Sequence, residues 1–166
     1  MSAQTFQVFH VRKIIRSALV ILFPLLVGAL SGWLTRNNTV FYQVLIKPPL
    51  APPGFIFPIV WSVLYLLMGV AALLVLRRGY NKPYVKDAMH FFVIQLALNF
   101  LWPIVFFNLR APLFAFLVLL TMWLFVGICT AKFYRINHTA GWLMLPTWLW
   151  TTFAGYLNLS IWLLNR

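Results

Sequence analysis

Rows of tryptophan, amide and small side chains mark three apolar segments of the chain. In QLALNFLWPIVFF they recur at offsets of 0, 4, 7 and 11, which is one face of a helix, as Gln95, Asn99, Trp102 and Phe106. The other two rows are Trp150, Ala154, Asn158 and Trp162, and Trp61, Tyr65, Gly69 and Ala72. Large indoles beside small residues leave concave space lined by π-faces and a few hydrogen-bond donors. We therefore predict a pocket for a large, flat, mostly apolar ligand.

Helix packing is the alternative explanation for each row. Small residues let helices approach closely, and side-chain amides hydrogen-bond across helices at about 1 kcal/mol or less. Packing accounts for any one row as well as a pocket does, but three converging rows favour the pocket. Gly28 and Gly32 in VGALSG form a further small-residue pair, for which we predict close packing between helices.

Acid–base and metal chemistry have few candidate residues in this sequence. Asp87 is the sole acidic residue, and it lies at the mouth of a predicted membrane span. His10, His90 and His138 lie at or near span ends, and the single cysteine, Cys129, excludes an intramolecular disulfide. The chain therefore lacks the residues of a carboxylate pair, a Ser-His-Asp triad or a carboxylate-bound metal site, and we predict no metal.

The three rows of residues lie on segments that we predict to be membrane-spanning helices. The chain has 166 residues, 63% hydrophobic and 8% charged, whereas soluble domains carry about 25% charged residues. Uncharged runs long enough to cross a bilayer cover residues 14–34, 58–76, 87–107, 112–131 and 139–164. They lack the ten-residue alternation of a transmembrane strand. We predict an all-α integral membrane protein, a single domain over residues 1–166 that forms a five transmembrane helix bundle.

The first run has a second interpretation as a signal peptide. Basic residues precede its apolar core, and Ala29-Leu30-Ser31 resembles a small-residue cleavage site. The uncharged stretch over residues 17–35 is long for such a segment, which favours a transmembrane helix.

Charge predicts the orientation in the membrane. Thirteen Lys and Arg against one acidic residue give a net charge of +12. Nine of them lie before or at the start of the first run or in the second and fourth loops: Arg12, Lys13, Arg16, Arg77, Arg78, Lys82, Lys86, Lys132 and Arg135. The opposite side has Arg36, Lys47, Arg110 and Arg166. This positive-inside bias predicts a cytoplasmic N-terminus, explains the charge without a nucleic-acid partner, and favours a bacterial inner membrane over a mitochondrial outer membrane.

With these residues in hand, the sequence resembles the translocator protein (TspO/MBR) family, also called tryptophan-rich sensory proteins or peripheral-type benzodiazepine receptors. The segments that carry the resemblance are YQVLIKPPLAPP, FPIVWSVLYLLMG, QLALNFLWPIVFF and PTWLWTTFAGYLN, in that order and spacing. The similarity covers residues 41–162 closely and the first helix loosely. It implies a five-helix bundle, often dimeric, that binds porphyrins, sterols and synthetic drug-like ligands in a pocket capped by the long first loop.

The resemblance also implies which residues line the pocket. They are Trp61, Asn99, Trp102, Phe107, Trp150, Ala154 and Asn158. We add Tyr65, which shares the row of Trp61, and Phe114, which stands where mammalian members carry a pocket-lining tryptophan. The family also has tryptophan where this chain has Phe41 and Leu50, so its ligand preference can differ from theirs.

A proline-rich segment, LIKPPLAPPGFIFPIVW, precedes and enters the second predicted helix, and most of it lies in the long loop over residues 35–57. Proline removes a backbone donor and fixes φ, so the segment cannot be the interior of a regular helix or a central strand. Prolines let a loop lie over a helix bundle with few unpaired donors. We expect a lid here, formed by Lys47, Pro48, Pro49, Pro52 and Pro53.

Three functions are compatible with the resemblance. The first is a membrane protein that binds tetrapyrroles such as protoporphyrin or haem, as sensor, scavenger or carrier, with no required cofactor. The second is an enzyme that degrades porphyrin in light, with Trp61 and Trp150 as catalytic indoles because they match positions implicated in bacterial members. The third is a structural membrane subunit.

The expected partners follow from the same resemblance. They are a porphyrin, haem or another apolar small molecule, membrane lipids, and a second copy of the chain in a homodimer. A short sequence pattern that has been proposed for sterol contact also occurs here, in Leu76, Tyr80 and Lys82. The pattern is weak evidence for sterol binding.

We predict that Lys47 lies on the outer side of the membrane and Lys82 on the cytoplasmic side, because of the charge distribution. In whole cells, an impermeant thiol reagent should label Lys47→Cys directly. It should label Lys82→Cys only after permeabilisation. The reverse pattern would overturn the orientation.

Overall fold

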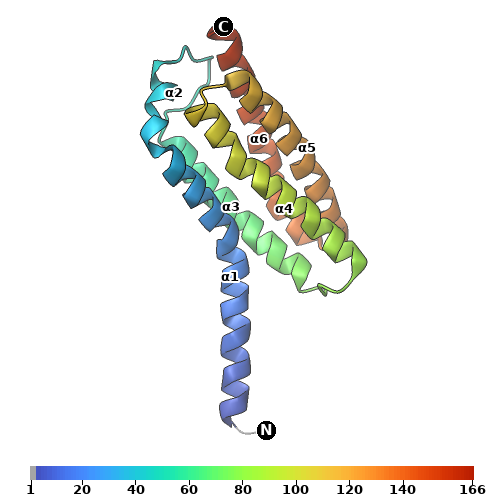
Figure 1. The fold of residues 1–166 in the computed structure, drawn as a ribbon. Helices are drawn as coiled ribbons and strands as arrows, with labels where there is room; N and C mark the ends of the chain where they lie inside the picture. The colour runs from blue at the N-terminus through green and yellow to red at the C-terminus, as the bar shows by residue number, and fades with distance from the viewer. Residues whose placement is uncertain (1–2) are drawn as a thin grey trace.

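The computed structural model describes residues 3–166, with side chains from Lys13 onward, so Arg12 lies outside the described side chains. This part of the chain is helical with short connections (Figure 1). Its elements are α1 (Ala3–Thr35), η1 (Arg36–Asn38), α2 (Val40–Val44), α3 (Ile56–Leu76), α4 (Pro83–Pro103), η2 (Ile104–Asn108), α5 (Pro112–Ile136) and α6 (His138–Leu164). The prediction of an all-α fold is confirmed.

Proline and asparagine residues mark where the helices begin. Pro83 and Pro112 occupy the first positions of α4 and α5, where a missing N–H removes no helical hydrogen bond. The Asn137 side chain accepts a hydrogen bond from the backbone N–H of Ala140 at 3.1 Å and caps α6. Helix α3 begins at Ile56, earlier than the predicted position 58, and Pro58 is tolerated because it lies in the first turn.

Four helical segments are long and apolar enough to cross a membrane: Lys13–Asn38, Ile56–Leu76, Pro83–Asn108 and Pro112–Ile136. Helix α6 has 27 residues, which is sufficient length, but it does not meet the same hydropathy criterion. Its threonine, asparagine, tyrosine and tryptophan side chains lower its mean hydropathy. Hydropathy therefore supports four of the five predicted membrane spans, and it does not support α6.

Helices α3, α4, α5 and α6 form a bundle, and α1 packs along α3 at one side of it (Figure 1). The N-terminal part of α1 extends beyond the bundle, whereas the C-terminus lies at the opposite end beside α2. Glycine allows α1 to approach α3. A Cβ on Gly69 would overlap the backbone carbonyl of Ile21, and a Cβ on Gly28 would overlap the ring of Tyr65.

Gly28 and Gly32 do not share one packing role. The prediction of close packing is correct for Gly28, which lies against Tyr65. One turn further along α1, a Cβ on Gly32 would meet no described atom within 4 Å. Helices α1 and α3 are therefore in contact at Gly28 and separated at Gly32.

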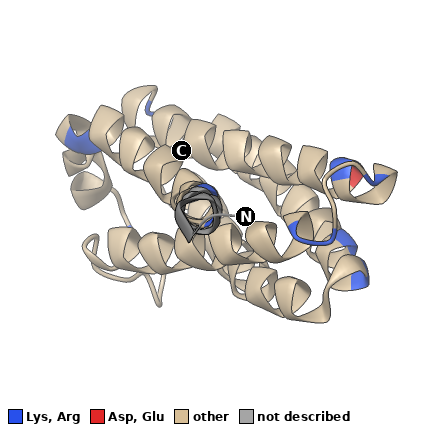
Figure 2. Ribbon diagram, turned by 90° about the horizontal axis from the view of Figure 1, so that it is seen from below, with Lys and Arg blue, Asp and Glu red and all other residues tan. Residues whose placement is uncertain are grey.

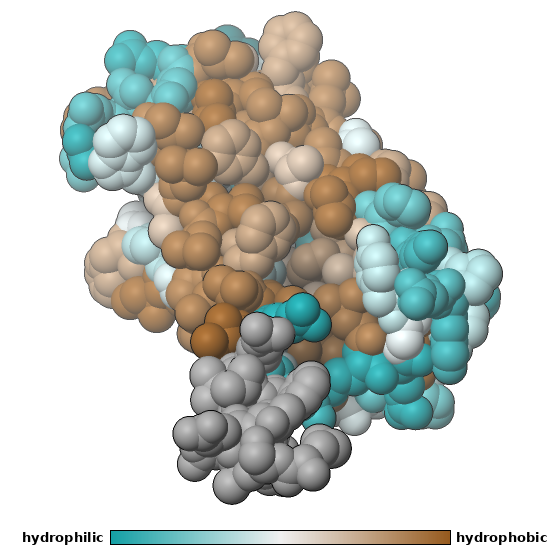
Figure 3. Space-filling model, turned by 60° about the horizontal axis from the view of Figure 1, so that its bottom comes forward, coloured by the Kyte–Doolittle hydropathy of each residue, from teal (hydrophilic) through white to brown (hydrophobic). Residues whose placement is uncertain are grey.

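Charged residues of the bundle gather at its ends (Figure 2). The single acidic residue, Asp87, forms an ion pair with Lys132. Between the ends, the surface is dominated by apolar side chains, seen as the brown band in Figure 3. This distribution fits an apolar membrane interior between two charged interfaces.

We expect Gly69→Ala to lower the melting temperature of the detergent-solubilised protein, because the added methyl group would push α1 away from α3. Overpacking of this kind costs about 1–3 kcal/mol. Gly32→Ala is the matched control in α1. It should leave stability unchanged or raise it by up to about 1 kcal/mol, since alanine is the better helix former. Equal melting temperatures for the two variants would contradict the close contact at Gly69.

Candidate ligand-binding site

A cavity of about 1110 Å³ lies between the helices below the loop that joins α2 to α3. This volume is at or slightly above the upper end of the usual range for small-molecule sites, about 300–1,000 Å³. Its walls come from α1, α2, α3, α4, α5, α6 and the proline-rich loop. The bundle therefore has room for a ligand larger than most metabolites.

The cavity brings together most of the nine residues predicted to bind the ligand. Seven of them line it: Trp61, Tyr65, Asn99, Trp102, Phe107, Ala154 and Asn158. Three of the predicted lid residues, Lys47, Pro52 and Pro53, line it as well. Residues from α3, α4 and α6 thus converge on one space.

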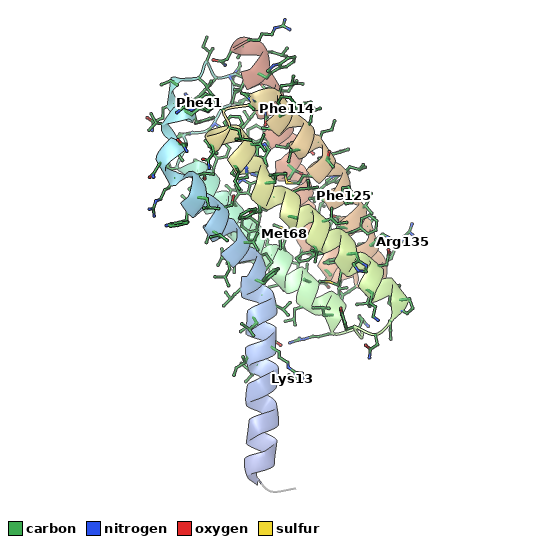
Figure 4. The ribbon with its side chains drawn as sticks, viewed as in Figure 1. Lys13, Phe41, Met68, Phe114, Phe125 and Arg135 are labelled. Atoms are coloured by element: carbon green, nitrogen blue, oxygen red, sulfur yellow. The ribbon has the colours of Figure 1, made fainter. Side chains whose placement is uncertain are left out.

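Four of the predicted site residues lie elsewhere. Phe114 is 66% exposed on the outside of the bundle, near the lid end of α5 (Figure 4), because its position on α5 points away from α4 and α6. Trp150 lies behind the cavity wall, with its ring centroid 6.2 Å from that of Phe57. Pro48 and Pro49 belong to the loop but do not line the cavity.

The floor of the cavity contains an unpaired hydrogen-bond acceptor. Asn99 is 2% exposed, and its Nδ2 donates to the backbone carbonyl of Gln95 at 2.8 Å and to the Gln95 Oε1 at 2.9 Å. Because a backbone carbonyl can only accept, this pairing fixes which atom of the Asn99 amide is the nitrogen. The Asn99 Oδ1 is left without a partner among the described residues. A ligand with an N–H or O–H group would satisfy it.

Asn158 joins three helices at the same level. Its Oδ1 accepts a hydrogen bond from the Trp102 Nε1 at 2.9 Å, and its Nδ2 donates to the backbone carbonyl of Pro112 at 2.7 Å. The amide on α6 therefore holds the indole on α4 and the first residue of α5. Since Trp102 has already donated its N–H, it presents only an aromatic surface to the cavity.

Aromatic rings beyond Trp102 extend this surface toward the lid. The rings of Trp102 and Phe106 are stacked with centroids 5.4 Å apart, and Phe106 meets Phe107 edge-on at 5.0 Å. Both phenylalanines lie in η2, a π-helical turn in which the N–H of Leu109 bonds to the carbonyl of Ile104. The turn follows Pro103, which cannot donate to the preceding turn of α4. Turns of this kind are frequent at functional sites.

Two cations stand at the mouth of the cavity. Arg36 lies 5.0 Å over the Trp33 ring, and the Lys47 Nζ lies 5.0 Å over the Tyr42 ring. The only carboxylate side chain of the sequence is that of Asp87, which pairs with Lys132. The mouth therefore carries positive charge that no acidic side chain of this chain neutralises.

Side chains from α6 and α2 hold the loop over the cavity. The Asn165 amide pairs with the backbone of Ile46, accepting from its N–H at 2.9 Å and donating to its carbonyl at 2.9 Å. The Tyr156 hydroxyl donates to the carbonyl of Pro49 at 3.1 Å, and the Tyr42 hydroxyl donates to that of Pro52 at 3.3 Å. Burial raises the pKa of Tyr42, which keeps its hydroxyl protonated as this bond requires.

Sequence reasoning missed Asn165, Tyr156 and Phe57. Asn165 and Tyr156 act on a loop more than a hundred residues away, and no periodicity links them to it. Phe57 stands in the proline-rich segment as one more apolar residue before α3. It lines the cavity and contacts the ring of Trp150, which does not line it, and only the three-dimensional arrangement shows this.

Comparison with known proteins places the chain among membrane proteins of one family. The sequence profile of the TspO/MBR family matches residues 20–163. The chain is 36% identical over 155 residues to the tryptophan-rich protein TspO of Chlorobaculum tepidum, covering 93% of this chain and 98% of that protein. It is 37% identical over 137 residues to the tryptophan-rich sensory protein of Cereibacter sphaeroides, covering 82% and 84%. It is 32% identical over 148 residues to the translocator protein of Bos taurus, covering 87% of each chain.

We expect Asn158→Leu to destabilise the bundle by about 1–3 kcal/mol, because it leaves the Trp102 N–H and the Pro112 carbonyl without partners. Adding Trp102→Phe removes one of those orphan groups. The double variant should therefore lose less stability than the sum of the two single variants in thermal or chemical unfolding. Strict additivity would show that the two side chains do not interact.

Proposed function

The chain belongs to the TspO/MBR family of integral membrane proteins, and on that premise we propose that its cavity binds a tetrapyrrole such as protoporphyrin. The observation that carries the proposal is the pairing of an aromatic-lined apolar cavity with an unneutralised cationic mouth. A sensor, scavenger or carrier would all need this binding step.

The interior of the cavity suits a flat ring. Trp61, Trp102 and Phe106 offer aromatic faces, and Ala154 opposite them leaves space. Ring stacking contributes about 0.5–1.5 kcal/mol per pair beyond the area that is buried.

The mouth suits carboxylates. A protoporphyrin carries two acidic side chains on one edge, and Arg36 and Lys47 supply cations on the cavity rim where that edge would lie. Ion pairs with hydrogen bonds between such groups are stronger than neutral hydrogen bonds. A sterol has no anionic group, so this feature favours the tetrapyrrole over a sterol.

We also propose that α6 is a fifth transmembrane helix and that the N-terminus is cytoplasmic in a bacterial inner membrane. Helix α6 packs along α5 and places its polar residues Thr147, Thr151 and Asn158 in the buried interior rather than toward lipid. Its low hydropathy therefore reflects its inward face. In this orientation the cavity mouth lies at the outer surface.

Removal of the mouth cations tests the proposed mode of binding. Arg36→Gln and Lys47→Gln should each weaken protoporphyrin binding about tenfold, in line with the ~1.5–3 kcal/mol of a hydrogen bond to a charged group. Neither should weaken binding of protoporphyrin dimethyl ester, which has no carboxylates. Arg166→Gln, a cation outside the cavity, is the matched control.

Binding is measured in a titration by the shift of the porphyrin absorption band. Parent protein that shows no saturable shift would remove the proposed function. Equal losses for the acid and the ester would remove the role of the cations while leaving the cavity as the site.

Light-driven degradation is a second candidate, because the Trp61 indole lines the cavity and would contact a bound ring. Under illumination in air, Trp61→Phe should bind protoporphyrin within about 1 kcal/mol of the parent, since phenylalanine keeps an aromatic face. It should yield less photoproduct because phenylalanine is much harder to oxidise. Trp150→Phe should have a smaller effect, since Trp150 does not line the cavity and contacts Phe57, which does.

Trp142, which is 62% exposed, provides the control: Trp142→Phe should behave as the parent does. The measurement is the absorption spectrum before and after illumination. An unchanged photoproduct yield in Trp61→Phe would exclude this indole from the chemistry and leave a binding function.

A further inference from the structure

The lid is held closed by contacts that a ligand entering from water would have to break. Asn165 pairs with both backbone groups of Ile46, and Tyr156 and Tyr42 bond to the carbonyls of Pro49 and Pro52. Opening the loop would separate these pairs together. A large apolar ligand therefore needs another way to reach the cavity, or must break the lid contacts.

A gap between α1 and α3 offers such a way. The two helices touch at Gly69 with Ile21 and at Gly28 with Tyr65. One turn beyond Gly28, Gly32 lines the cavity, and a Cβ added there would meet no described atom within 4 Å. The helices thus separate on the lid side of the Gly28 contact.

The gap reaches the outer surface of the bundle. Four residues both line the cavity and are exposed at this place, two from each helix, and we call them the window: Ala29, Gly32, Pro58 and Ser62. The Ser62 hydroxyl donates to the carbonyl of Pro58 at 2.7 Å, so no free donor faces outward there. Small or internally satisfied groups of this kind are compatible with contact with lipid.

The depth of the window places it at the level of lipid chains. Ala29, Gly32, Pro58 and Ser62 all lie within the segments Lys13–Asn38 and Ile56–Leu76, which are apolar enough to span a membrane. Ser62 is six residues into α3, roughly 9 Å below its lid end at helical rise. The hydrocarbon core is about 30 Å thick, so this position falls within the half of the bilayer nearer the lid.

We propose that the window is the route by which ligands dissolved in the bilayer enter and leave the cavity without passing the lid. The ligand class is a flat amphiphile that partitions into the lid-side leaflet, with its acidic groups toward Arg36 and its ring toward Trp61. The inference rests on the proposed function for the identity of that ligand. The route itself follows from the geometry of α1 and α3.

A thiol placed in the cavity tests the route without any tetrapyrrole. Ala154 lines the cavity and is 5% exposed, and the only native cysteine, Cys129, is fully buried. In lipid nanodiscs, N-phenylmaleimide, which partitions into the bilayer, should label Ala154→Cys. Parent protein without the added cysteine gives the background.

Two further changes separate the window from the lid. Ser62→Trp in the Ala154→Cys protein should slow the labelling about tenfold by filling the window. Val63→Trp is the matched control, because Val63 is the adjacent residue of α3, is 53% exposed and does not line the cavity. Asn165→Ala, which frees the loop at Ile46, should leave the labelling rate within twofold.

The opposite result would overturn the proposal: unchanged labelling in Ser62→Trp together with faster labelling in Asn165→Ala would assign entry to the lid. Failure to label Ala154→Cys from the bilayer would also refute the window. Because the readout needs no porphyrin, a failed porphyrin titration would remove the proposed function and leave this test intact.

Discussion

Polar groups inside a membrane have no water to bond, so each of them must find its partner within the protein. This constraint explains how the bundle is held together. Asn158 bonds to Trp102 and Pro112 across three helices, and the Ser31 hydroxyl donates to the carbonyl of Phe100 at 2.9 Å, linking α1 to α4. Four buried side-chain atoms among the described residues depart from the pattern: the Asn99 Oδ1, the Thr147 Oγ1, the Trp148 Nε1 and the Trp150 Nε1. Of these four residues, Asn99 alone lines the cavity, where a ligand can supply the donor.

Along the contact between α1 and α3, close packing gives way to open space toward the lid. Where the helices touch, Gly28 and Gly69 leave no room for a side chain. Where the helices part, Gly32 and Ser62 line the space. The Ser62 hydroxyl already donates a hydrogen bond within α3. The cavity is therefore covered by lid contacts at its mouth and reaches the surface of the bundle between α1 and α3 at its side. Both features suit a ligand that is mostly apolar with a charged edge.

Much of this arrangement could be predicted from the sequence. Helical periodicity placed Trp61, Asn99 and Asn158 on the faces of their own helices, and these faces meet at one cavity. Periodicity does not predict how each helix is rotated relative to its neighbours. It also does not predict which side chains of a row reach the cavity. Trp150 shares a row with Asn158 yet contacts Phe57 and does not line the cavity, and Phe114 points outward from α5. The hydropathy of α6 is lowered in part by Thr147, Thr151 and Asn158, which are buried in the bundle, and a count along the sequence cannot distinguish such residues from ones exposed to water.

The most direct test of the central claim is a structure of the protein in lipid with protoporphyrin bound. The porphyrin ring should lie between Trp61 and Trp102, with its carboxylates beside Arg36 and Lys47. A porphyrin bound outside the cavity, or with its carboxylates directed to the floor at Asn99, would contradict the account.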